Sequence, residues 1–394
     1  MNLLYLIKQP LTPRDWDRFG IGFMLEKGHL VTVLDMSDVI HPGLPNDRSE
    51  VVRDERVDVR EIKSWDKFNQ QRQTFQDSDL VIFLIQSYGL SRSTYRPLRM
   101  IAKTGVPYLI LAPTLYPGWN IKTGAFSLSG RISDLWARLR NMDPLNSLIS
   151  RLPPSWLGIV MASYIVNTSK VGSRPNSLAG PRTKAIKAHT NDYEIYLGEL
   201  KRNPRTFERA VFLDQFLPYH VDFQELNADP VNDQEYFGGL KRLFERIENE
   251  LGLEVVIAAH PRANYRNRQD VFGGRQVISG QTVHLIATSR LTIAHTSTAI
   301  GLAALFEKPV MILATQALYH RQVYDKYYYE AFAAELGTPV RFFDDPELVD
   351  LSNVYALNDD LYDCYRKTYF QCPGAAEKPF WEIVLDNIAA NHDR

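Results

Sequence analysis

Residues 255–265 are VVIAAHPRANY, and residues 291–313 are LTIAHTSTAIGLAALFEKPVMIL. In each stretch a short apolar run, rich in β-branched residues, ends abruptly in polar residues, which is typical of a buried parallel strand. The second run leads directly into an Ala- and Leu-rich pattern that predicts a helix over 299–306. We therefore expect two buried strands whose carboxyl ends carry His260-Pro261 and His295-Thr296-Ser297-Thr298.

The alternation of strand and helix patterns runs through the whole chain and predicts parallel, doubly wound sheets. We expect strands over 3–7, 30–34, 80–85, 107–111, 163–167, 210–213, 255–259, 277–278, 291–294 and 309–313. At 394 residues, two domains are expected. The predicted boundaries are 1–180 and 181–377, with residues 170–187, rich in Ser, Gly, Pro and Arg, as the linker. A terminal helix over 378–394 is expected to return to the first domain.

Composition excludes several classes of protein. A formal net charge of −1 gives no basic field for nucleic acid. Two cysteines, Cys364 and Cys372, cannot form enough disulfide bonds to stabilise a chain of this size, so a reduced cytosolic setting is expected. No apolar run is long enough to span a bilayer.

The helical pattern over 131–152 has two interpretations: a surface helix packed on the sheet, or an interfacial helix that contacts the inner face of the cell membrane beside a lipid-linked substrate.

His260 stands where a buried strand has to end, because Pro261 cannot continue a central ladder. Its imidazole is then held on a loop at the edge of the sheet, where ligands of open α/β sheets bind. A neutral imidazole can donate a hydrogen bond to a phosphate oxygen, and a protonated one can stabilise departing negative charge. The alternative is a histidine that only caps the strand.

Three consecutive hydroxyl residues, Thr296, Ser297 and Thr298, lie between the next strand and its helix. An ordinary N-cap needs only one hydroxyl, whereas three, followed by the small Ala299 and Gly301, favour an anion site at a helix N-terminus. For His295 beside them, packing and ligand contact are equally open.

Asp214 and Gln215 follow the strand over 210–213 at the same expected edge. Asp214 can bind a sugar hydroxyl or act as a base, and a capping aspartate is an equal alternative. Arg262, Tyr265 and Arg266 follow His260-Pro261 and can help to hold a diphosphate or the acceptor, although arginines in loops are commonly only solvated.

Several motifs are missing. The sequence has no GxGxxG after its first strand, no GxxxxGK[ST], no GxSxG and no DxD at a strand end. Its histidines lack metal-ligand spacing, so neither a metal nor a cofactor is predicted.

His260-Pro261, Ser297-Thr298 and the FLDQFLP stretch over Phe212–Pro218 resemble the GT-B glycosyltransferases, in particular bacterial sialyltransferases, polysialyltransferases and related capsule or lipopolysaccharide enzymes. The resemblance implies two Rossmann-like domains facing a central cleft. It also implies that His260 contacts the donor phosphate and assists its departure, and that Ser297 and Thr298 bind the same phosphate. The family's acidic D/E-D/E-G motif is absent, and Asp214 replaces it by position only.

The expected function is that of a metal-independent glycosyltransferase that moves a sugar from a nucleotide donor to a surface glycan or lipid-linked glycan. The predicted donor is a CMP-activated ulosonic acid of the sialic acid type. The predicted donor site consists of His260, Pro261, Arg262, Thr296, Ser297, Thr298 and Gln215. The alternatives are a CDP-glycerol-type polymer transferase, a catalytically silent nucleotide-sugar-binding subunit of a polysaccharide assembly system, and an epimerase of the same architecture.

Overall fold

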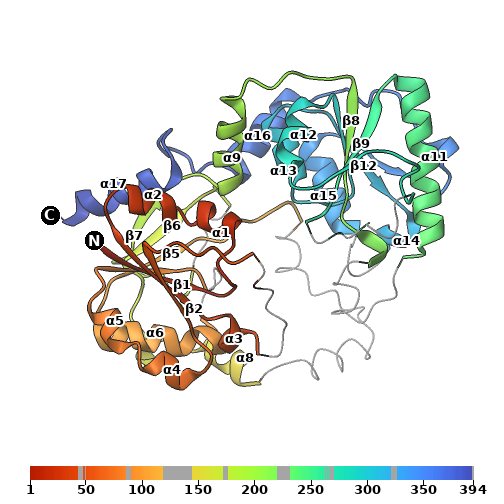
Figure 1. Cartoon of the computed structure of the whole chain (residues 1–394). Helices are drawn as coiled ribbons and strands as arrows, with labels where there is room; N and C mark the ends of the chain where they lie inside the picture. The colour runs from red at the N-terminus through yellow and green to blue at the C-terminus, as the bar shows by residue number, and fades with distance from the viewer. Residues whose placement is uncertain are drawn as a thin grey trace. The chain divides into compact units, whose positions relative to one another are not determined.

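The computed structural model describes residues 1–42, 48, 50–85, 90–118, 144–171, 176–219, 231–261, 263, 265, 270–320 and 326–392. The chain divides into two compact units, each built on its own parallel sheet (Figure 1). The first unit comprises residues 1–114, 127–191 and 371–394, and the second contains residues 192–370 with a short segment that begins at Leu115. The predicted pair of parallel α/β sheets is therefore confirmed.

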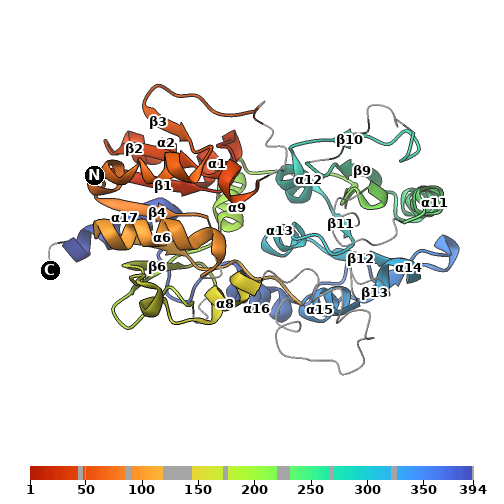
Figure 2. The ribbon, with the colours of Figure 1, turned by 90° about the horizontal axis from the view of Figure 1, so that it is seen from below.

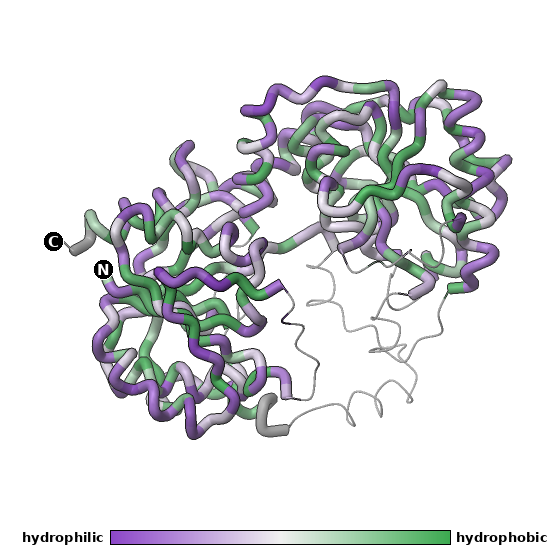
Figure 3. The backbone as a smooth tube through the Cα atoms, viewed as in Figure 1, coloured by the Kyte–Doolittle hydropathy of each residue, from purple (hydrophilic) through white to green (hydrophobic). Residues whose placement is uncertain are grey.

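The first sheet has seven strands in the order β3-β2-β1-β4-β5-β6-β7. All its neighbours pair in parallel. The bounds are β1 Asn2–Ile7, β2 Leu30–Asp35, β3 Val57–Glu61, β4 Leu80–Phe83, β5 Tyr108–Leu111, β6 Tyr164–Asn167 and β7 Lys184–Lys187. The apolar colour follows the strands of each unit in Figure 3 because their side chains form the cores.

Helices cover both faces of the first sheet. One core cluster joins the sheet to α3 Ser37–Ile40, α4 Trp65–Asn69, α5 Arg72–Gln76, α6 Arg92–Thr104 and α8 Pro144–Arg151. The other cluster joins it to α1 Pro13–Arg18, α2 Ile21–Glu26 and α17 Phe380–His392. A short η1 turn, Pro154–Leu157, follows α8. Among the described ranges, no helix is both long and apolar enough to cross a lipid bilayer.

The terminal helix α17 packs on the first unit through Trp381. The Trp381 indole nitrogen donates to the Arg18 carbonyl at 3.0 Å. A Cβ added to Gly20 would lie 2.1 Å from the Trp381 ring, and Gly20 has a φ of 62°. Only glycine meets both demands without strain, so this position separates α1 from α2 and admits the indole.

The second sheet has six parallel strands in the order β10-β9-β8-β11-β12-β13. Their bounds are β8 Arg209–Leu213, β9 Glu254–Ala258, β10 Val277–Ile278, β11 Leu291–Ala294, β12 Val310–Ala314 and β13 Val340–Phe342. The helices are α9 Asn191–Leu200, α11 Asp233–Leu251, α12 Thr282–Thr288, α13 Ile300–Leu305, α14 Gln316–Tyr319, α15 Lys326–Leu336 and α16 Asp359–Tyr369, with 3₁₀ turns η2 Leu217–Tyr219 and η3 Pro346–Leu348.

The predicted linker and first boundary are displaced. Residues 184–187, expected within the linker, form β7 at the edge of the first sheet and pair with β6. In this strand Ala185 and Ile186 stand between two lysines, and only Ile186 is buried, so its apolar signal is too weak to stand out in the sequence. The unit boundary therefore falls at Asn191 and not near residue 180.

Candidate functional site

The predicted site residues of the second unit lie at the carboxyl ends of three adjacent strands. In the pairing register, Leu213 at the end of β8 lies opposite Ala258 of β9 on one side and Ala294 of β11 on the other. The residues that follow these three positions therefore emerge at the same edge of the sheet. The chain passes from β8 outward to β9 and β10 and then returns to β11 on the other side of β8. That reversal is the topological switch point at which open α/β sheets bind ligands.

Asp214 connects the loops that follow β8 and β9. Its side chain is buried, with 4 % of its surface exposed. One carboxylate oxygen accepts from the Phe216 amide at 2.8 Å. The other accepts from the His260 amide at 3.3 Å and from the Tyr265 hydroxyl at 2.8 Å. These three bonds agree with the interpretation of Asp214 as a capping residue. One of them also holds the backbone of His260 in place.

Tyr265 is held in this arrangement by its ring as well as its hydroxyl. The ring contacts Phe216 edge-on at a centroid distance of 5.4 Å and Phe272 at 5.3 Å. Burial raises the pKa of the Tyr265 hydroxyl, and the Asp214 carboxylate beside it raises that pKa further. Tyr265 therefore stays a neutral hydrogen-bond donor to Asp214.

Phe216 occupies a backbone conformation that a side chain rarely adopts. Its φ is 52°, in the left-handed region, where a residue with a Cβ is destabilised by about 1–2 kcal/mol. The bond from its amide to Asp214 closes a turn that offsets this cost. Strained positions of this kind are concentrated at functional sites. Sequence reasoning could not predict this strain, because aromatic residues are not typical of left-handed turns.

His260 begins a tight turn two residues after the end of β9. The Ala263 amide donates to the His260 carbonyl at 2.8 Å, which places Pro261 at the second position of the turn, where its fixed φ is favoured. The His260 side chain is half-buried and Pro261 is exposed. The expected exit of the chain from the sheet at His260-Pro261 is therefore confirmed.

Gln215 bridges the loops that follow β8 and β11. Its side-chain oxygen accepts from the Thr296 amide at 2.9 Å. The bond spans the switch point, because β8 and β11 are the two strands between which the chain order reverses. Gln215 and Thr296 thus meet at the predicted position, although this direct bond was not foreseen.

The three hydroxyls do not cap the helix as the sequence suggested. Helix α13 begins at Ile300, and Ala299 takes the cap position without a side-chain bond. The Ser297 hydroxyl accepts from the Ala299 amide at 3.3 Å, while the Ser297 and Thr298 carbonyls accept from the Ile300 and Gly301 amides. Two overlapping turns, each closed by a hydrogen bond between residues three positions apart, thus lead into the helix. Ser297 remains half-buried and Thr298 is exposed at this loop.

Gly301 serves the packing of α13. It is buried, and a Cβ added to it would lie 2.3 Å from the ring of Phe370. Glycine is required here because the aromatic ring lies directly against the start of α13. This packing accounts for the glycine, and the sequence pattern could not show it because Phe370 lies far along the chain.

His295 is a core residue. It is fully buried, and its Nδ1 lies 2.7 Å from the Leu313 carbonyl, which can only accept, so Nδ1 carries the proton. Its Nε2 then accepts from the Tyr236 hydroxyl at 2.8 Å. Burial lowers the pKa of His295 to about 4. The packing alternative is thus the one realised, with Tyr236 of α11 as a partner that sequence reasoning missed.

Acid should destabilise the second unit through His295. Its pKa is about 4 in the folded chain and ordinarily 6.5, so the unfolded state binds the proton more tightly. The free energy of unfolding should therefore fall by about 3 kcal/mol as the pH drops from 7 to 4. Denaturant titrations across this range measure the slope, and the His295→Gln variant should reduce it. In a proton NMR titration of the unaltered protein, a ring that protonates near pH 6.5 would contradict the expectation.

Some predicted contacts lie outside the described residues, namely Arg262, Arg266 and positions 131–143 of the helical pattern over 131–152. The last part of that pattern, Pro144–Arg151, forms α8. Within the described ranges, no group of three or more His, Cys, Asp or Glu side chains is arranged to hold a metal ion.

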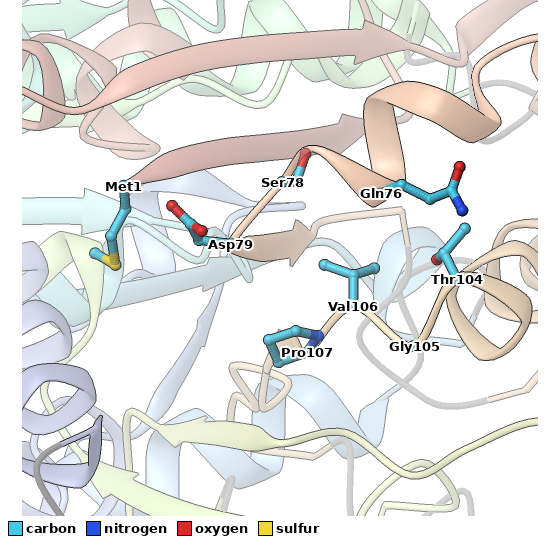
Figure 4. A pocket seen from close by; sticks show the side chains of 8 residues that line it. All are labelled: Met1, Gln76, Ser78, Asp79, Thr104, Gly105, Val106 and Pro107. Carbon is cyan, nitrogen blue, oxygen red and sulfur yellow. The ribbon is translucent and has the colours of Figure 1, made fainter.

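A cavity of about 600 Å³ lies in the first unit and is shown in Figure 4. It is lined by Met1, Gln76, Ser78, Asp79, Thr104, Gly105, Val106 and Pro107. These residues precede β1, β4 and β5, so the cavity is at the amino edge of the first sheet, opposite to the edge where such sheets bind ligands. The Asp79 carboxylate accepts a hydrogen bond from the backbone amide of Asn2 at 2.7 Å, and so holds the first residue of β1. We assign no function to this cavity.

Comparison with known proteins identifies the fold. No protein-family model and no curated protein sequence matches this chain. The wall teichoic acid polymerase TagF superposes with a TM-score of 0.52 at 12% identity, covering 100% of this chain and 90% of its own. A Listeria monocytogenes protein assigned as a UDP-N-acetylglucosamine 2-epimerase gives a TM-score of 0.51 at 11% identity, with 99% and 96% covered. A TagF variant soaked with CDPG gives 0.50 at 11% identity, with 100% and 90% covered. The chain thus has the GT-B type of fold.

Proposed function

We propose that this chain is a glycosyltransferase that binds a nucleotide-activated donor at the carboxyl edge of its second sheet and transfers the sugar without a metal ion. One observation carries the proposal. His260, Gln215 and the hydroxyl residues Thr296–Thr298 follow three adjacent strand ends at the switch point of a Rossmann-like sheet. An imidazole and several hydroxyl donors at that position suit an anionic leaving group.

In this proposal the residues take separate roles. The bond between the anomeric carbon and the phosphate oxygen breaks, the phosphate keeps the electron pair, and His260 stabilises it by a hydrogen bond or a proton. Ser297 and Thr298 donate hydrogen bonds to the same phosphate. The acceptor hydroxyl attacks the anomeric carbon and gives its proton to a base.

Asp214 is the predicted base, but its oxygens already accept three hydrogen bonds, and this arrangement supports a positioning role. Gln215 and Pro261 shape the loops, and Arg262 is a proposed phosphate contact.

We propose a CMP-activated ulosonic acid as the donor and a surface glycan, free or lipid-linked, as the acceptor. The support is the resemblance of His260-Pro261 and Ser297-Thr298 to the motifs of sialyltransferases. A CDP-linked donor is the second candidate, because TagF, which shares the fold, has been soaked with CDPG. Sugar epimerisation is the third, because the fold also occurs in the Listeria protein.

A thermal shift screen with CMP, CDP, UDP and GDP tests the donor. A nucleotide that binds only the folded protein raises the melting temperature by mass action, with about 2.7 kcal/mol of added stability at a hundredfold excess over Kd. We expect the largest shift from CMP. A larger shift from CDP would support the polymer transferase, and one from UDP would support the epimerase. Donor binding without turnover would support the silent subunit, and no shift from any nucleotide would contradict a donor site.

Transfer should survive chelation. The proposed site handles the leaving charge with His260 and hydroxyl donors, so removing divalent cations should leave the rate unchanged within about twofold. The measurement is the rate of transfer in EDTA, compared with the rates in added magnesium and manganese. If EDTA abolished transfer and either metal restored it, the metal-independent mechanism would be wrong.

A further inference from the structure

Positive charge is concentrated in one part of this chain. The whole sequence has 45 Lys and Arg against 46 Asp and Glu, yet residues 80–191 contain 14 Lys and Arg and only two Asp. The described part of that stretch includes nine basic residues and no acidic one: Arg92, Arg96, Arg99, Lys103, Arg151, Lys170, Arg182, Lys184 and Lys187. Balanced charge in the chain as a whole therefore conceals a basic region in the first unit.

Helix α6 aligns four of these charges. Arg92, Arg96, Arg99 and Lys103 are spaced by four, three and four residues, which places them along one face of a helix. The opposite face packs into the core of the sheet, where Leu98 and Ile101 are buried. Within the part of the chain that the structure describes, Arg96, Arg99 and Lys103 form no ion pair. The basic face is thus turned away from the core without neutralising partners for these three side chains.

Large apolar side chains are exposed next to this helix. Trp156 of η1 is 78 % exposed and Leu148 of α8 is 55 % exposed. Val160 and Met161 follow at 45 % and 38 %. These residues lie within 14 positions of one another, and an exposed indole is unusual because tryptophan buries most of its surface in soluble proteins.

The basic and apolar residues belong to one surface. The Arg99 guanidinium donates to the Gly158 carbonyl at 2.9 Å, which ties α6 to the segment after η1. Helices α6 and α8 are in contact, and both lie on the same side of the first sheet in Figures 1 and 2. We call the combination of α6, α8, η1 and residues 158–161 the α6–η1 surface.

We propose that the α6–η1 surface docks on a bilayer that contains anionic phospholipids. Tryptophan and aliphatic side chains insert at the boundary between headgroups and acyl chains, while Arg and Lys beside them meet the negative headgroups. A soluble polyanion would be bound by the charges alone and would leave Trp156 and Leu148 without a role. The proposal does not depend on the donor site. A membrane contact was predicted from the sequence for residues 131–152, and the α6–η1 surface shares only α8 with that range, whereas α6, Trp156 and residues 158–161 lie outside it.

Vesicle sedimentation of the full chain tests the proposal. Vesicles of phosphatidylcholine with about one third phosphatidylglycerol should bind the protein, and vesicles of pure phosphatidylcholine should bind it at least tenfold more weakly, because each Lys or Arg near an anionic surface contributes about fivefold to the affinity. Raising the salt from about 0.1 M to 0.5 M should release the protein, because the Debye screening length becomes shorter as the ionic strength rises. Equal binding to both kinds of vesicle would overturn the role of the basic face.

Three variants separate the charges from the apolar residues. Arg96→Gln with Lys103→Gln should weaken binding to anionic vesicles roughly 25-fold. Trp156→Ala should weaken it several-fold, and Leu148→Ser should act in the same direction. The matched controls lie in the second unit and should bind as the unaltered protein does: Leu348→Ser, which removes a side chain 79 % exposed, and Lys201→Gln with Arg205→Gln.

Dextran sulfate in solution separates a bilayer from a polyanion. If Trp156→Ala and Leu148→Ser both retained full affinity for vesicles, and dextran sulfate competed with the vesicles at matched charge, the occupant would be a soluble polyanion and the membrane proposal would be wrong. Melting curves of each variant establish that the fold is kept, which is expected because all the altered side chains are at the surface or partly exposed. Nucleotide binding should be unchanged in every variant, so failure here leaves the proposed donor site unaffected.

Discussion

Replacing His260 by Ala should lower the rate of transfer by roughly two to three orders of magnitude, because a group that stabilises the charge developing on the leaving phosphate contributes about that much. The fold should be kept. The bond from residue 260 to Asp214 is made by the backbone amide, which alanine retains, and the imidazole is only half-buried. Steady-state kinetics with the nucleotide sugar, together with a melting curve, measures both quantities.

His260→Asn refines this experiment, and His29→Ala controls it. Asparagine can donate a hydrogen bond but cannot supply a proton, so a rate between those of the unaltered protein and the alanine variant would indicate that hydrogen bonding carries part of the effect. His29 precedes β2 at the amino edge of the first sheet, so its replacement should leave the rate unchanged. Full activity in a folded His260→Ala protein would remove His260 from the mechanism.

The double change Ser297→Ala with Thr298→Ala should weaken donor binding by more than tenfold and leave acceptor affinity unchanged. Each hydrogen bond to a charged oxygen contributes about 1.5–3 kcal/mol, and 1.4 kcal/mol corresponds to a factor of ten. Stability should change little, because neither hydroxyl caps α13 and the one described side-chain bond is that of Ser297 with the Ala299 amide. Calorimetric titration of the nucleotide beside a melting curve distinguishes the two effects.

Thr206→Ala is the matched control, since Thr206 precedes β8 at the amino edge of the same sheet, and it should leave the affinity unaltered. A lower melting temperature with unaltered nucleotide affinity in the double variant would mean that Ser297 and Thr298 only stabilise their loop. If the double variant bound the acceptor more weakly and the nucleotide as before, Ser297 and Thr298 would belong to the acceptor site and not to the site of the donor phosphate.

The sequence by itself determined the elements whose signal is local. Buried parallel strands are continuous apolar runs, so Leu291–Ala294 was predicted to the residue, and most other strands to within one or two residues. The exit of the chain at His260-Pro261 was also predicted from the sequence, because proline has no amide hydrogen to donate to a central ladder. Periodicity failed where the apolar signal was thin, as in β7, with its two lysines, and in β13, which has only three residues.

Only the tertiary structure decided which side chains serve the fold and which face the site. His295 and Asp214 end strands just as His260 does, yet one is buried against Tyr236 and Leu313, and the other accepts bonds from two loops. Gly301 is small because Phe370, 69 positions later, packs on it. These partners are distant in sequence, and a hydrogen bond or a ring contact between distant residues leaves no periodic pattern. A residue type and its spacing can therefore predict the edge of a sheet, whereas the role of each residue at that edge depends on neighbours that only folding supplies.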